Sequence, residues 1–238
     1  MRQLIFSFVI FIVCASHLFA DEHNAEILFQ KLQPLADSNN PEAQYHLGMM
    51  YNNGLGTDAD YEKAMTLFRE SAALGDPLGA YKLGCYYDGQ YQTSLAVDRE
   101  KAFQSKLYAA TKGYALAQND VAIYYAEDGD WKNAFRWWKA AADQGFSSSL
   151  KNIGAAYWSG YGTETNKPAG YAYFLLWQRA KGKKLSPDAV ASLTELKAQM
   201  TESQFAEANA IALDWHAVPT ELTLKARQGL NAAAAMIQ

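Results

Sequence analysis

Residues 47–56 read LGMMYNNGLG, and this pattern returns three more times along the 238-residue chain. It recurs as LGCYYDG from Leu83, as VAIYYAEDG from Val121 and as IGAAYWSGYG from Ile153, at intervals of 36, 38 and 32 residues. A tyrosine takes the same place in every copy, at Tyr51, Tyr87, Tyr125 and Tyr157. Self-similarity at intervals of about 20 to 50 residues is typical of a repeat architecture. The sequence therefore contains four copies of one structural unit.

A second pattern follows each of these tyrosines. Alanines eight residues apart lie at Ala64 and Ala72, Ala102 and Ala110, Ala134 and Ala142, and Ala172 and Ala180. A glycine comes three residues after each of the first three pairs, at Gly75, Gly113 and Gly145. Residues spaced by about two helical turns share one side of a helix, and glycine readily adopts the left-handed conformation that ends a helix. Each unit is therefore predicted to be an antiparallel pair of helices joined by a loop of variable length.

The two patterns together resemble the Sel1-like repeat, a relative of the tetratricopeptide repeat. The first unit carries the motif best, with Leu47, Gly48, Tyr51, Gly54, Gly56, Lys63, Ala64, Ala72, Ala73 and Gly75. The second unit departs from it, because Ser105 and Lys106 stand where bulky apolar residues usually pack. The resemblance implies an all-α fold, a right-handed α-solenoid of antiparallel helix pairs with helical caps.

The repeats divide the chain into segments. Four repeats are expected over residues 41–182, at 41–76, 77–114, 115–146 and 147–182. The ends of a solenoid expose apolar faces unless they are capped. Residues 21–40 are accordingly expected to form an N-terminal capping helix, and residues 183–238 a C-terminal helical cap. Within that cap the sequence predicts helices at 187–200, 202–216 and about 220–237, the first two capped by Ser186 and Thr201.

The first twenty residues have the pattern of a secretory signal peptide. Arg2 is followed by an apolar run from Leu4 to Val13, and the chain becomes polar at Asp21. The run is shorter than the roughly 20 apolar residues that a membrane span requires. We expect cleavage after Ala20, a mature protein without a membrane span, and a periplasmic or secreted location.

Composition and residue inventory exclude several functions. Half of the residues are hydrophobic and the net charge is −4, which argues against a disordered chain and against a nucleic-acid partner. No HExxH motif or Cys/His cluster is present, so no metal and no cofactor are expected. Only Cys85 remains after signal cleavage, which excludes an internal disulfide.

One short motif keeps an enzymatic alternative open. Ser148-Ser149-Leu150-Lys151 matches the serine-x-x-lysine of penicillin-recognising enzymes, and would make the protein an envelope hydrolase acting on β-lactams or peptidoglycan. No Lys-Thr-Gly follows the motif, and a serine run is expected at this point as a helix cap. The preferred expectation is therefore a protein that is not an enzyme.

The preferred function is an exported scaffold or adaptor that holds a protein or peptide in a concave groove. In a stacked solenoid the first helix of each pair lines the concave side. With Leu47 and Tyr51 turned inward, the opposite face of that helix holds Tyr45, Met49 and Asn52. Applying the repeat intervals gives the full predicted binding set: Tyr45, Met49, Asn52, Tyr81, Cys85, Asp88, Asn119, Ile123, Lys151 and Trp158.

Overall fold

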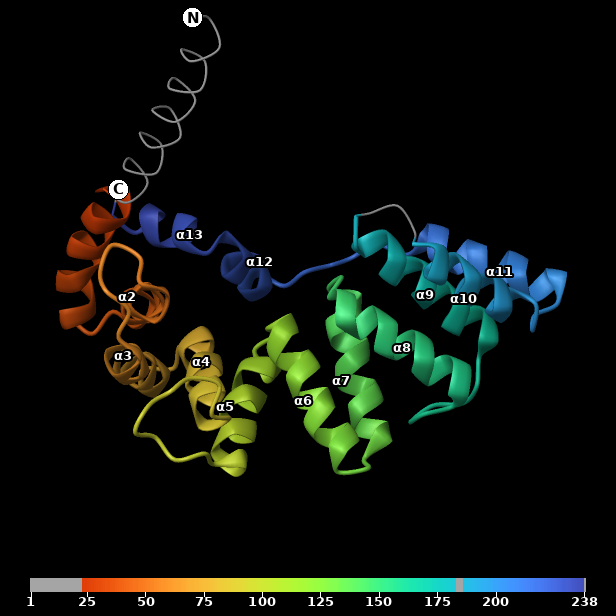
Figure 1. Ribbon diagram of the computed structural model, residues 1–238, viewed down its shortest axis with the longest axis horizontal. Coiled ribbons are helices and arrows are strands. Elements are labelled where there is room, and N and C mark those ends of the chain that lie inside the picture. The colour runs from red at the N-terminus through yellow and green to blue at the C-terminus, as the bar shows by residue number, and fades with distance from the viewer. Residues whose placement is uncertain (1–22, 183–185, 238) are drawn as a thin grey trace, which may run out of the picture. The chain divides into compact units, whose positions relative to one another are not determined.

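The computed structural model describes residues 23–182 and 186–237, and every regular element in these ranges is a helix (Figure 1). The chain forms two compact units. Unit 1 comprises residues up to Ser105 together with those from Gln228 onward, and unit 2 comprises Lys106–Arg227. The expected signal peptide and its junction at Ala20 lie outside the described residues.

Unit 1 contains the first repeat and the start of the second. Its helices are residues 23–37, α2 (Pro41–Asn53), α3 (Tyr61–Ala73), α4 (Pro77–Tyr87), the first half of α5 (Arg99–Thr111) and α13 (Leu230–Ala235). Pro41 and Pro77 occupy the first helical position, where the missing backbone N–H has no helical partner to lose. The side chains of Asn40 and Asp76 precede them and accept backbone N–H groups of the first turn.

Unit 2 contains the remaining repeats and most of the C-terminal segment. Its helices are the second half of α5, α6 (Ala115–Glu127), α7 (Trp131–Asp143), α8 (Ser147–Ser159), α9 (Lys167–Ala180), α10 (Pro187–Lys197), α11 (Glu202–Asp214) and α12 (Glu221–Gln228). The serine run predicted to cap α8 does not do so, because the cap position belongs to Phe146, which makes no side-chain hydrogen bond. Ser186 and Thr201 do cap α10 and α11, as the sequence predicts.

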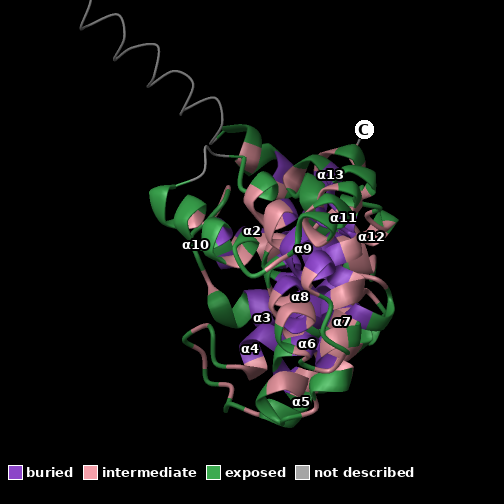
Figure 2. Ribbon diagram, turned by 90° about the vertical axis from the view of Figure 1, so that its right-hand side faces the viewer, coloured by how far each residue is buried: buried purple, intermediate pink, exposed green. Residues whose placement is uncertain are grey.

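The first alanine of each repeat pair lies on the packed side of its helix. Ala64, Ala102, Ala134 and Ala172 are all fully buried, and Figure 2 shows buried residues concentrated on the packed sides of the helices. Gly48 serves the same purpose, since a Cβ there would lie 2.8 Å from the ring of Phe68. The glycines predicted to end the second helices, Gly75, Gly113 and Gly145, have φ values of 89°, 93° and 79°. The helix-pair prediction is confirmed.

Both ends of the described chain pack against repeats. In unit 1, Leu28 and Leu32 of the helix at 23–37 share a core with Leu47 of α2 and with Ala233 of α13. In unit 2, α11 packs on α9. The single helix predicted at 220–237 is wrong. It is broken into α12 and α13 at Gly229, which adopts a positive φ of 54°.

Candidate functional site

The ten side chains predicted to line a groove lie in very different surroundings. Tyr45, Asn52, Tyr81, Cys85 and Asn119 are buried, Met49, Asp88 and Trp158 are half-buried, and Ile123 and Lys151 are exposed. The physical reason is that helices such as α2 are packed on more than one side. The ring of Tyr45 lies 6.1 Å from that of Phe68, and the hydroxyl of Tyr86 donates a hydrogen bond to Asn52 at 2.8 Å.

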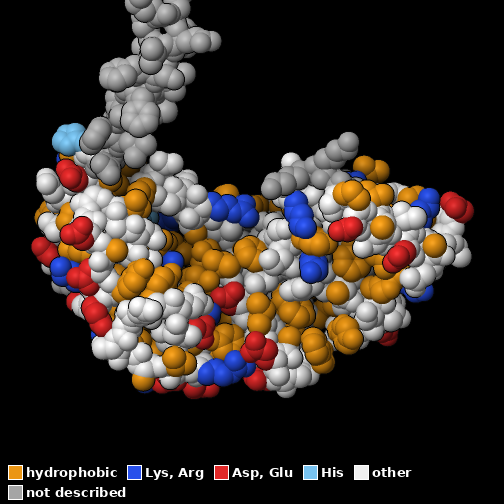
Figure 3. All heavy atoms as spheres, in the orientation of Figure 1, with side chains coloured by type: hydrophobic (Ala, Val, Ile, Leu, Met, Phe, Trp, Pro, Cys, Tyr) orange, Lys and Arg blue, Asp and Glu red, His pale blue; other side chains and the backbone are white. Residues whose placement is uncertain are grey.

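The face opposite Leu47 is therefore committed to packing within unit 1, and its buried side chains offer little surface to a partner in this conformation. Cys85 is 2 % exposed, as expected for a small buried hydrophobe. Figure 3 shows hydrophobic side chains spread among charged ones on one face of the surface. Scattered apolar side chains of this kind are usual on protein surfaces. The binding role of the ten residues stays a prediction.

Ser148 and Lys151, the residues of the enzymatic alternative, do not contact each other through a hydrogen bond. Ser148 is an exposed residue in the first turn of α8, and no hydrogen bond joins it to Lys151. The amine of Lys151 lies 5.2 Å from the centre of the Trp177 ring. The buried hydroxyl of this segment belongs to Ser149, which donates to the side-chain oxygen of Asn119 at 2.9 Å. Within the described ranges, no group of three His, Cys, Asp or Glu side chains could hold a metal ion.

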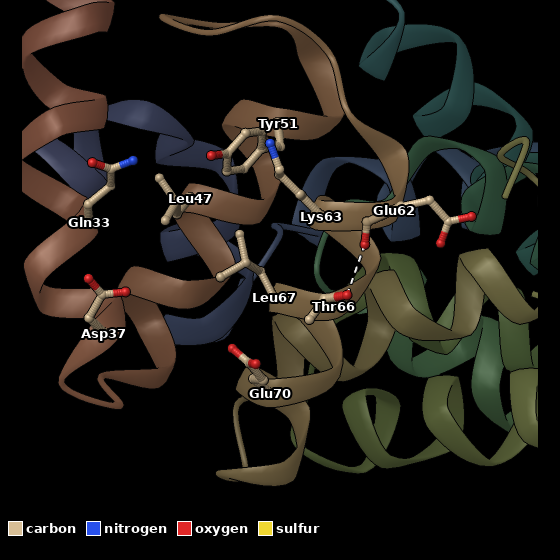
Figure 4. Close-up of a pocket in the computed structure, with 9 residues that line it drawn as sticks. All are labelled: Gln33, Asp37, Leu47, Tyr51, Glu62, Lys63, Thr66, Leu67 and Glu70. Carbon is tan, nitrogen blue, oxygen red and sulfur yellow. Dashed lines mark hydrogen bonds between the residues drawn. The ribbon is translucent and has the colours of Figure 1, made fainter. Parts of the chain in front are cut away.

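Unit 1 carries a hollow of about 530 Å³, hereafter the unit 1 hollow, between the helix at 23–37, α2 and α3 (Figure 4). Its lining residues are Gln33, Asp37, Leu47, Tyr51, Glu62, Lys63, Thr66, Leu67 and Glu70. A volume of this size falls in the range of natural ligand and side-chain pockets.

The floor of the unit 1 hollow is made by residues of the repeat motif. Leu47 and Tyr51 lie one turn apart on α2, so both side chains point to the same side of that helix. Leu67 of α3 adds a third apolar group. The ring of Tyr51 packs edge-on against Phe29 with centroids 5.2 Å apart, which holds the tyrosine in place. Tyr51 and Leu67 are half-buried and provide most of this preformed apolar surface, since Leu47 is only 5 % exposed.

The charged groups of the unit 1 hollow lie at two ends. Lys63 lies at one end, with its amine 5.2 Å from the centre of the Tyr51 ring and 3.3 Å from the carboxylate of Asp60. The backbone N–H of Lys63 donates to the same carboxylate and holds the pKa of Asp60 below its usual value. Asp37 and Glu70 lie at the other end, on opposite walls (Figure 4). The hollow is therefore polarised, with an acidic end and a cation–aromatic end.

Unit 2 has a second well-defined contact region, where the C-terminal segment crosses the ends of α5 and α7. The hydroxyl of Thr220 donates to the carbonyl of Gly113 at 2.9 Å, and its backbone N–H donates to the side-chain oxygen of Gln144 at 3.0 Å. The hydroxyl of Thr223 accepts the backbone N–H of Ala115 at 3.0 Å. The chain itself thus supplies an N-terminal cap for α6 from 108 residues away.

The two glycines at these helix ends are needed for the segment to approach. A Cβ on Gly113 would lie 2.9 Å from the Thr220 side chain, and a Cβ on Gly145 would lie 2.9 Å from Ala217. Sequence reasoning found both glycines as helix ends but missed the contact. The available signal was the pair of aromatic residues, Tyr114 and Phe146, at the positions that Asn40 and Asp76 occupy in unit 1.

Sequence reasoning also missed the unit 1 hollow. The repeat motif contains Leu47, Tyr51 and Lys63, but the prediction assigns Leu47 and Tyr51 to packing and places the binding surface on the other face of α2. The acidic end could not be read from the repeat motif, because Asp37 lies in the segment that precedes the first repeat.

These features define an all-helical repeat of packed helix pairs with caps at both ends. The chain belongs to the Sel1 repeat family, whose repeat matches residues 41–76, 77–104, 115–146 and 147–177, more than half of the chain. The matches start at the same residues as the expected repeats.

Known relatives share the repeats over part of their length. The chain is 30% identical over 152 residues to an uncharacterized protein of Neisseria meningitidis serogroup B, covering 63% of this chain and 31% of that protein. It is 27% identical over 142 residues to a putative sel1-like repeat-containing protein of Acanthamoeba polyphaga mimivirus, covering 58% and 26%. The chain thus spans less than a third of these curated relatives.

A solved structure shows the same arrangement of helices. The crystal structure of a Sel1 repeat protein from Oxalobacter formigenes superposes with a TM-score of 0.65 at 25% identity, covering 72% of this chain and 49% of that one. In the described ranges, no helix has the length and apolar character needed to cross a membrane.

Proposed function

We propose that this Sel1 repeat protein is an exported scaffold of the cell envelope, and that a protein or peptide partner docks in the unit 1 hollow. Sel1 repeat proteins generally act as protein-interaction scaffolds, which supports the proposal at the level of the family. The observation that carries it for this chain is the hollow itself. It combines an apolar floor with a polar rim, as protein docking sites do.

Export is the first part of the proposal, and the sequence of residues 1–20 supports it. N-terminal sequencing of the protein recovered from the soluble envelope fraction should begin at Asp21. A protein that retains Met1 and sediments with membranes would contradict export, and would leave the docking proposal to be tested separately.

Docking in the hollow is testable by site-specific crosslinking. Thr66 lines the hollow and is exposed, and Gln104 is an exposed helical residue of unit 1 that does not line it. A photoreactive benzoylphenylalanine at Thr66 should capture one identifiable protein in living cells, while the same group at Gln104 should not.

The captured protein must then bind the purified chain, and Leu67→Arg should weaken that binding because it places a long charged side chain on the apolar floor. Leu67 is only half-buried, so the helix pair should keep its melting temperature within a few degrees. Capture at both positions alike, or undiminished binding by Leu67→Arg, would rule the hollow out as the docking site.

A further inference from the structure

We infer that the unit 1 hollow selects a peptide segment that carries an arginine or lysine side chain next to an aliphatic one. This inference rests on the proposed docking function and names the chemistry of the partner. It follows from the way in which charge and apolar surface are divided within the hollow.

The acidic end provides the selectivity for a cation. Asp37 comes from the helix at 23–37 and Glu70 from α3, so the two carboxylates approach one end of the hollow from opposite walls (Figure 4). In the part of the chain that the structure describes, neither carboxylate lies within 4.0 Å of a basic side chain of this protein. Glu70 accepts a hydrogen bond from the amide of Gln44 at 3.5 Å. A cationic side chain of a partner would therefore gain attraction from both carboxylates, and an anionic one would be repelled.

The other charged groups of the lining do not neutralise this end. Lys63 is held at the opposite end by Asp60 and by the ring of Tyr51. The carboxylate of Glu62 is directed away from the centre of the hollow in Figure 4, and it accepts the backbone N–H of Ser94 at 2.6 Å. The hollow thus presents two uncompensated negative charges at one end only.

The apolar floor explains why the ligand is a peptide and not a bare cation. Tyr51 and Leu67, both half-buried, can cover an aliphatic side chain, whose burial contributes about 25 cal/mol per Å². A volume of about 530 Å³ accommodates more than one side chain. Arginine and lysine themselves carry apolar stems below their charged groups, and such stems pack well along a surface of this kind.

The experiment compares two labelled pentapeptides that differ only in charge. The first is fluorescein-labelled Ala-Leu-Arg-Leu-Ala with an amidated end, and the second replaces arginine by its neutral isostere citrulline. Titration of the purified protein, followed by fluorescence anisotropy at low salt, should give about tenfold tighter binding of the arginine peptide, as expected for two exposed charge pairs. This preference should shrink when salt is raised.

Isosteric variants connect the preference to the two carboxylates. In the double variant Asp37→Asn with Glu70→Gln, the affinity for the arginine peptide should fall to that for the citrulline peptide. The affinity for the citrulline peptide should stay unchanged. Both residues are exposed and both replacements keep a hydrogen-bond acceptor, so the melting temperature should be unaffected. Glu100→Gln removes an exposed charge of α5 outside the hollow and should keep the arginine preference.

Each outcome decides the inference. Equal affinity for the two peptides, or an arginine preference that survives Asp37→Asn with Glu70→Gln, overturns it. If neither peptide binds while Thr66 still crosslinks its partner in cells, the inference is wrong and the proposed function stands. If the crosslink at Thr66 also fails, the proposed docking site is wrong as well.

Discussion

The two units start the same helices in different ways. In unit 1 the first helices of the pairs, α2 and α4, begin after Asn40 and Asp76, whose side chains accept the N–H groups of the first turn. In unit 2 the corresponding positions before α6 and α8 are aromatic, and neither makes a side-chain cap. The start of α6 is instead capped by Thr223 of the C-terminal segment. The first residue of α2 and of α4 is a proline without an N–H, whereas the first residue of α6, Ala115, has one that Thr223 accepts. One repeat architecture can therefore cap its first helices locally or from a distant part of the chain, at different backbone N–H groups.

A second difference concerns the core position four residues after the first alanine of each repeat pair. Repeat 1 has Phe68 there, and the third and fourth repeats have Trp138 and Leu176, all buried. The second repeat has Lys106, which is equally buried and lies 3.0 Å from Asp120. Its amine also lies 5.7 Å from the centre of the Tyr124 ring. An ion pair thus occupies a site that the other repeats fill with an apolar side chain.

The largest expected effect comes from breaking that ion pair. Asp120→Ala should lower the free energy of unfolding by about 3 to 5 kcal/mol, because it leaves the charge of Lys106 buried without its carboxylate. The double replacement Lys106→Met with Asp120→Ala should be close to neutral, because no charge is left buried and the other repeats hold an apolar residue at position 106. Both free energies can be measured by urea denaturation. A double replacement that costs as much as Asp120→Ala alone would show that the ion pair is not what distinguishes the second repeat.

A smaller effect is expected at the distant cap. Thr223→Val keeps the side-chain shape but removes the acceptor for the N–H of Ala115, in a site that is 3 % exposed. This substitution should lower the free energy of unfolding by about 1 to 3 kcal/mol, as expected when a buried backbone donor loses its hydrogen-bond partner. The local cap of α2 serves a different donor, the N–H of Ala43, and Asn40→Ala should lower the free energy of unfolding by about 1 kcal/mol. If Thr223→Val is harmless in thermal and urea unfolding, α6 does not depend on the C-terminal segment.

A double-mutant cycle sharpens the same point. Tyr114→Asp gives α6 a local cap of the kind found in unit 1, which accepts N–H groups of the second and third helical residues and not the N–H of Ala115. Thr223→Val should therefore cost the same in the Tyr114→Asp background, with a coupling energy within about 0.5 kcal/mol of zero. A rescue of about 1 kcal/mol or more would show that α6 needs only one cap, whichever N–H group it serves.

The smallest expected effect concerns the enzymatic alternative at the start of α8. We expect the purified protein not to hydrolyse nitrocefin above the uncatalysed rate, and Ser148→Ala to leave both this rate and the melting temperature unchanged. The physical reason is that a lysine base must lie within hydrogen-bond reach of the serine, whereas the amine of Lys151 lies 5.2 Å from the centre of the Trp177 ring and is not hydrogen-bonded to Ser148. A turnover that disappears in Ser148→Ala would instead establish a hydrolase.

The repeat motifs by themselves determined the helix pairs and the glycines that end them, and N-cap preference determined the caps at Ser186 and Thr201. These features follow from periodicity and local backbone preference, which act between residues a few positions apart. Tertiary structure decided the rest. It buries Tyr45 and Cys85 where the sequence suggested a groove, brings Thr223 to Ala115, and forms the unit 1 hollow by placing Asp37 opposite Glu70. Such contacts join residues tens of positions apart, and they depend on how whole helices pack, which no local pattern encodes.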